Sequence, residues 1–110
     1  MANDSPSAIV KKVDTQVSMI LRKVNRYDIG EKARDALAKL QQALVDARIY
    51  CSSYELSETT EEKTENAKQA RRYLEQARRS ILRASEFNVF GAVDVAQLTA
   101  TIDQAKADLK

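Results

Sequence analysis

The fold of this chain is predicted most directly from residues 33–54, which read ARDALAKLQQALVDARIYCSSY. Apolar residues recur in this stretch at alternating spacings of three and four, which places them on one face of an α-helix. The face consists of Ala33, Leu37, Leu40, Leu44, Ala47, Cys51 and Tyr54, with Ala36, Ala43 and Tyr50 beside them. A half-buried β-strand would instead alternate apolar and polar residues with a period of two. We therefore predict a long amphipathic helix over residues 29–54.

Three further segments carry the same spacing, and we predict helices over residues 6–27, 60–86 and 94–109. Their apolar faces consist of Val10, Val13, Val17, Ile20, Val24 and Tyr27 in the first, Ala67, Ala70, Leu74, Ala77, Ile81 and Ala84 in the third, and Val95, Leu98, Ile102, Ala105 and Leu109 in the fourth. Short connections make consecutive helices antiparallel neighbours. The predicted fold class is all-α, an antiparallel up-down-up-down four-helix bundle with a short fourth helix.

Residues that can cap free backbone amides stand at the start of each predicted helix. Ser, Thr and Asp accept hydrogen bonds from the first turn, Pro fits the first helical position, and Glu or Gln three residues later completes a capping box. The four signals are Ser5 with Pro6, Asp28 with Glu31, Thr59 with Glu62, and Asp94 with Gln97. We expect residues 1–5 to form a flexible N-terminus and residues 1–110 to form one domain.

Composition agrees with this fold and excludes several classes of function. Only 2 Gly and 1 Pro occur in 110 residues, which argues against an all-β or loop-rich chain. The sequence has no His and no glycine-rich loop, which excludes His-based acid–base chemistry, His-bearing metal sites and Walker or Rossmann nucleotide cradles. We expect no cofactor.

The cysteine count and the N-terminal sequence predict the compartment. Cys51 is the only cysteine, so it cannot form an internal disulfide, and the first residues lack the basic and apolar regions of a signal peptide. No stretch approaches the length of apolar sequence that a membrane span needs. We expect a cytoplasmic protein without membrane attachment.

Catalysis and metal binding have little support in the sequence. Cys51 lies on the predicted core face and no His can activate it, so we expect a buried, inert thiol and no enzymatic activity. Five glutamates occur between residues 55 and 65, but their spacing does not match an EF-hand loop. We interpret them as a solvated helix cap; they are Glu55, Glu58, Glu61, Glu62 and Glu65.

The short fourth helix points to an uncovered surface. It spans about 24 Å, whereas the second and third span about 39 Å each, so it does not reach the end where the second helix turns into the third. We interpret that end as a contact for a protein partner or a second copy. The interpretation includes Val45 and Ile49, which lie outside the apolar face of the second helix, and the turn between the third and fourth helices at the opposite end. The candidate residues are Tyr50, Tyr54, Leu56, Val45, Ile49, Phe87 and Phe90. Alternatively, the two helices cover each other there and the tyrosine hydroxyls stay hydrated.

A second hypothesis is that the basic half of the third helix binds nucleic acid or another anionic ligand. Its candidate residues are Lys68, Arg71, Arg72, Arg78, Arg79 and Arg83. Against it, the net charge is only +2, and Glu75 lies within helical reach of several of these arginines. The leading prediction is therefore a non-enzymatic interaction or adaptor module.

A third hypothesis is a small-molecule pocket beside the alanines of the third helix. Alanine faces more commonly permit close helix packing than leave a void, because protein interiors are dense. The alanines concerned are Ala36, Ala43, Ala67, Ala70, Ala77 and Ala84.

Overall fold

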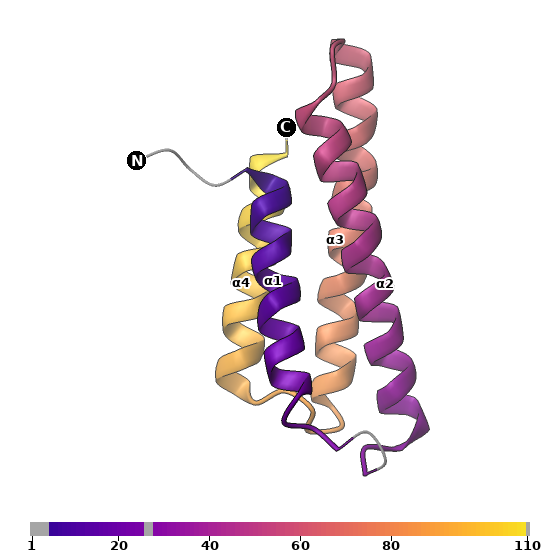
Figure 1. Ribbon diagram of the computed structural model, residues 1–110, viewed down its shortest axis with the longest axis vertical. Helices are drawn as coiled ribbons and strands as arrows, with labels where there is room; N and C mark the ends of the chain where they lie inside the picture. Colours follow the sequence, from indigo (N-terminus) through magenta and orange to yellow (C-terminus); the bar gives the residue numbers. More distant parts are fainter. Residues whose placement is uncertain (1–4, 26–27, 110) are drawn as a thin grey trace.

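Four α-helices account for most of residues 5–25 and 28–109, the part of the chain that the computed structural model describes (Figure 1). They are α1 (Pro6–Leu21), α2 (Gly30–Glu55), α3 (Thr60–Ser85) and α4 (Ala92–Asp108). Consecutive helices run in opposite directions, and α1 also packs against α4, which closes the bundle. The most extensive contact is between α2 and α3. The predicted antiparallel four-helix bundle with a short fourth helix is confirmed.

Two of the predicted helix caps form as expected. The Ser5 hydroxyl accepts a hydrogen bond from the backbone N–H of Ala8 at 3.4 Å, ahead of a proline in the first turn. The Thr59 hydroxyl accepts one from the N–H of Glu62 at 3.1 Å. Each bond satisfies an amide that the helix itself leaves unpaired.

The other two caps differ from the prediction. The N-cap of α2 is Ile29 and that of α4 is Gly91, and within the described residues neither position makes a side-chain cap hydrogen bond. The capping boxes predicted at Asp28 and Asp94 are therefore wrong. Gly30 has a φ of 81°, a left-handed conformation that glycine adopts without strain, so the chain enters α2 through a backbone turn.

The first helix is shorter than its apolar spacing predicts. It ends at Leu21, and the N–H groups of Lys23 and Val24 bond to the carbonyls of Ile20 and Leu21 in tighter turns. Val24 is still half-buried against the core, because the turn carries it to the same side. The prediction of helix over residues 22–25 is wrong, and residues 26–27 lie outside the described part.

The core consists of apolar side chains from all four helices. Among the residues that the structure describes, no polar or charged side chain is buried. The largest fully buried side chains are Leu40, Leu44, Leu74, Ile81, Leu98, Ile102 and Leu109. The alanines of α3 on the predicted face are 0% exposed, as close packing of α3 on its neighbours requires.

α1 and α4 are shorter than α2 and α3, which leaves part of the α2–α3 hairpin without neighbours. α1 has 16 residues and α4 has 17, whereas α2 and α3 have 26 each. Figure 1 shows the turn between α2 and α3 projecting beyond α1 and α4 at one end of the bundle. The uncovered end that the short fourth helix predicts is present, whereas the early end of α1 at Leu21 lies at the opposite end of the bundle.

Candidate protein-contact surface

The outer face of α2 carries exposed apolar side chains in one line. Val45 is 53% exposed, Ile49 is 55% exposed and Leu56, at the end of the helix, is 80% exposed. With the half-buried Ser52 they recur at spacings of four, three and four, so they lie along one side of the helix. We call Val45, Ile49, Ser52 and Leu56 the outer stripe.

The outer stripe faces away from the core. The core-facing residues of the same stretch are Leu44, Ala47 and Cys51, all at most 2% exposed. A single exposed apolar residue is ordinary on a protein surface. Apolar residues that repeat with the spacing of a helix–helix seam are instead typical of a surface that packs against another helix.

The two tyrosines predicted as partner contacts mainly join α2 to α3. The rings of Tyr50 and Tyr73 stack with centroids 5.6 Å apart and an angle of 11° between their planes. The ammonium nitrogen of Lys63 lies 5.1 Å from the centroid of the Tyr54 ring. Both predicted tyrosines are half-buried against the core, so they are only partly available to a partner.

The turn between α3 and α4 is less accessible than predicted. Phe90 is only 3% exposed and belongs to the core, so its assignment as a partner contact is wrong. Asn88 has a φ of 62°, the left-handed conformation common after a helix C-terminus, and this turn carries Val89 and Phe90 inward. Phe87 is half-buried, with the guanidinium carbon of Arg83 5.1 Å from its ring centroid.

The candidate anion-binding residues of α3 do not form one strip. Arg71 donates to the backbone oxygen of Leu109 at 2.8 Å, and Arg78 pairs with Asp103 of α4 at 3.4 Å, so both side chains face α4. Arg79 pairs with Glu75 at 3.5 Å and Arg83 with Glu86 at 2.6 Å. Arg72 lies 5.9 Å from the Tyr73 ring centroid, and Lys68 is exposed. Intramolecular contacts therefore engage five of the six cations.

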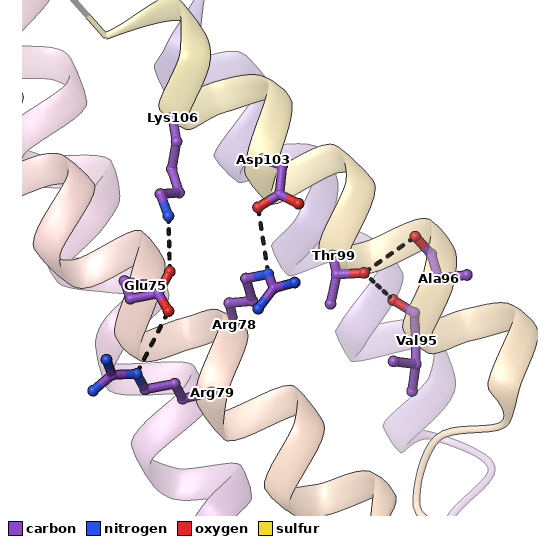
Figure 2. A network of polar contacts seen from close by, with 8 residues as sticks. All are labelled: Glu75, Arg78, Arg79, Val95, Ala96, Thr99, Asp103 and Lys106. Atoms are coloured by element: carbon purple, nitrogen blue, oxygen red, sulfur yellow. Dashed lines mark hydrogen bonds and ion pairs between the residues drawn. The ribbon is translucent and has the colours of Figure 1, made fainter.

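Glu75 joins α3 to α4 through Lys106 and also pairs with Arg79 on its own helix (Figure 2). Its carboxylate accepts a hydrogen bond from the Lys106 ammonium at 2.7 Å and lies 3.5 Å from Arg79. The hydrogen bond from Lys106, with the charges of Lys106, Arg79 and Arg78, lowers the pKa of Glu75 against the opposing effect of desolvation. Sequence periodicity does not predict this contact, because it depends on how α4 is aligned with α3.

A groove between α2 and α3 brings further cations together. A hollow of about 840 Å³ has Lys32 and Lys39 of α2 and Arg79 and Arg83 of α3 in its lining. Glu31 and Asp35 lie there too, and Asp35 pairs with Lys39 at 3.1 Å. The two lysines are not predictable from the charges of one helix, because helical spacing carries no information on which faces of two helices meet.

The glutamates near the turn between α2 and α3 are exposed, and the cysteine of α2 is buried. All five glutamates between residues 55 and 65 are exposed, and in the described part of the chain no three His, Cys, Asp or Glu side chains gather to hold a metal ion. Cys51 is 0% exposed, and desolvation by burial, with a smaller effect of Glu55, raises its pKa to about 12. Its thiol is therefore neutral and a poor nucleophile near pH 7.

No described helix is both long enough and apolar enough to cross a membrane. No protein-family model matches the chain, and neither a curated protein nor a solved structure matches it significantly.

Proposed function

We propose that this protein acts by binding another protein chain through the outer stripe of α2. The observation that carries the proposal is the alignment of Val45, Ile49 and Leu56, each more than half exposed, on one side of a long and well-packed helix. Burying such side chains against an apolar partner is favourable in proportion to the area removed from water. The hairpin behind the stripe is joined by the most extensive helix contact of the bundle, and a surface that is already ordered loses less entropy on binding.

The proposed function is non-enzymatic. The only thiol of the chain is buried and protonated, and the described core contains only apolar side chains, so the interior supplies no acid, base or nucleophile. The stripe itself consists of three apolar side chains and one hydroxyl, a composition suited to contact rather than chemistry.

The proposal is tested by replacing Ile49 with the photo-crosslinking amino acid p-benzoylphenylalanine and irradiating cells that express the variant. We expect a discrete protein adduct, identified by mass spectrometry, that is lost when Val45 and Leu56 are both changed to glutamate. The matched control carries the photoprobe at the exposed Thr15 of α1, and we expect no discrete adduct there. Equal labelling from positions 15 and 49 would refute the proposal.

A second candidate function is the binding of a polyanion in the α2·α3 groove. It is favoured by the position of Lys32 and Lys39 across one hollow from Arg79 and Arg83. Affinity for a phosphate backbone falls steeply with salt, whereas an apolar contact does not.

This candidate is tested by fluorescence anisotropy with a labelled DNA duplex at several salt concentrations. We expect Lys39→Glu with Arg83→Glu to abolish binding. Lys11→Glu with Lys23→Glu, the same change of charge on and just after α1, is the matched control and should reduce it only slightly. Equal losses in both double variants would mean that net charge alone attracts the DNA.

A further inference from the structure

We infer that the occupant of the outer stripe is a second copy of this chain, docked antiparallel so that Val45 of each copy packs against Leu56 of the other. The inference rests on the proposed function, because it uses the same surface. It goes further in naming the partner, the direction of its helix and the register of the contact.

The charges beside the stripe are arranged on two distinct sides. Glu55 accepts hydrogen bonds from the hydroxyl of Ser7 at 3.0 Å and from its N–H at 3.4 Å, so it lies on the side of α2 that faces α1. Arg48 precedes Glu55 by seven residues, which is two helical turns, and lies on that same side. Asp46 and Lys39 line the groove toward α3 and therefore flank the other side.

An antiparallel pair related by a two-fold axis brings identical sides of the two helices together. When Val45 packs against Leu56 of the second copy, Ile49 packs against Ser52 of that copy. Arg48 then lies opposite position 53 of the second copy, two residues from its Glu55. The symmetry creates this pair of opposite charges twice. Arg48 is exposed and has no ion pair among the residues that the structure describes, so its charge is available to a second copy.

The neighbouring antiparallel register in which the contact moves toward the N-terminus of α2 is disfavoured by like charges. It would pack Val45 against Ile49, which shifts the second helix by seven residues. Arg48 would then lie beside Arg48 of the second copy on one side of the seam, and Asp46 beside Asp46 on the other. Like charges at such positions are destabilising and act against that register.

A parallel pair offers no compensating attraction. In parallel coiled coils a residue flanking the seam faces the residue five positions further along the partner helix. Arg48 would then face Ser53, and Gln41 would face Asp46, so no pair of opposite charges forms. Of the three arrangements, only the antiparallel one with Val45 against Leu56 joins apolar contacts with opposite charges.

The contact is narrow, because each copy contributes one face of one helix. Interfaces smaller than the standard size are typical of weak or transient association. We expect a dissociation constant in the micromolar range or weaker, with the charged pairs setting the register more than the affinity.

Cysteine cross-linking tests the register directly. Positions 45 and 56 are about 16 Å apart along α2, too far for a disulfide within one chain, which needs Cα atoms within about 7 Å. We expect the double variant Val45→Cys with Leu56→Cys to form a covalent dimer under mild oxidation at least tenfold faster than either single variant. The native Cys51 is buried and stays in place.

Charge exchange gives an independent readout in sedimentation velocity. We expect Arg48→Glu to weaken the dimer at least fivefold, and Arg48→Glu combined with Glu55→Arg to restore it. Because Glu55 also contacts Ser7, far-UV circular dichroism and a thermal melt establish that each variant is folded. A folded double variant that fails to recover the dimer would overturn the inference.

Two other results would also overturn it. Single cysteine variants that cross-link as fast as the double variant would indicate a parallel or irregular contact. A protein that stays monomeric in sedimentation velocity at every concentration measured, with no cross-link in any variant, would exclude a second copy. The photoprobe at position 49 separates this failure from that of the proposed function, because an adduct with a different protein would leave the outer stripe as a binding surface.

Discussion

The buried thiol of Cys51 predicts a loss of stability at alkaline pH. Burial raises the pKa of this thiol from 9.0 to about 12, because the thiolate is poorly solvated in the apolar core. In the unfolded chain the thiol regains its ordinary pKa. Between these two values the unfolded state releases a proton that the folded state retains, so the free energy of unfolding falls as the pH rises.

The size of the effect follows from the two pKa values. Linkage gives a loss of about 0.4 kcal/mol at pH 9 and about 1.4 kcal/mol at pH 10, with almost none at pH 7. The Cys51→Ala variant removes only the thiol, and its packing loss does not depend on pH.

The measurement is urea unfolding followed by circular dichroism at 222 nm at pH 7, 8, 9 and 10, with a reductant that excludes disulfides. We expect the stability advantage of the wild type over Cys51→Ala to shrink by about 1.4 kcal/mol between pH 7 and pH 10. An advantage that stays constant over this range would show that the thiol is hydrated in the folded protein, and the reasoning from its burial would fail.

Three further predictions concern the bundle itself. Thr59→Ala removes the N-cap of α3, and we expect it to lower the free energy of unfolding by about 1 kcal/mol in urea titrations. Leu74→Ala should cost about 2–5 kcal/mol, whereas Leu82→Ala, on the same helix but 39% exposed, should cost much less, and equal losses would contradict the assigned core. Because hydrogen bonding from Lys106 lowers the pKa of Glu75, the ionised carboxylate stabilises the fold above its ordinary pKa, and this contribution is lost as the pH falls through the lowered value. The stability difference between wild type and Glu75→Gln should therefore decrease as the pH falls below the ordinary value of 4.5, and a pH-independent difference would contradict the assignment.

The helices and most of their core faces could be predicted from the sequence, because one physical rule governs both. Residues such as Leu40, Leu74 and Ile102 follow the helical period, and burying them requires the backbone to be helical. Caps that depend on a single side chain, at Ser5 and Thr59, were also predictable. The end of α1 was not, because Val24 keeps the apolar spacing after the backbone has left the helix.

Contacts that join two helices could not be predicted from the sequence. Stacking of Tyr50 on Tyr73 and the meeting of Lys39 with Arg79 depend on the alignment of α2 with α3, which periodicity within one helix does not specify. Phe90 was misassigned because its turn depends on the left-handed backbone at Asn88. Of the candidate contact residues, the exposed Val45 and Ile49 were recognisable because they fall outside the core period.

The way the bundle closes has a consequence for how the chain folds. The extensive contact between α2 and α3 joins neighbouring segments through a short turn, whereas the contact between α1 and α4 joins helices at opposite ends of the described chain. Closing a short loop loses less chain entropy than closing a long one, so the hairpin can form early and the pairing of α1 with α4 comes late. Interactions made after the transition state govern the unfolding rate. The lifetime of the native protein is therefore set by its two short helices, although its two long helices contain more of the core.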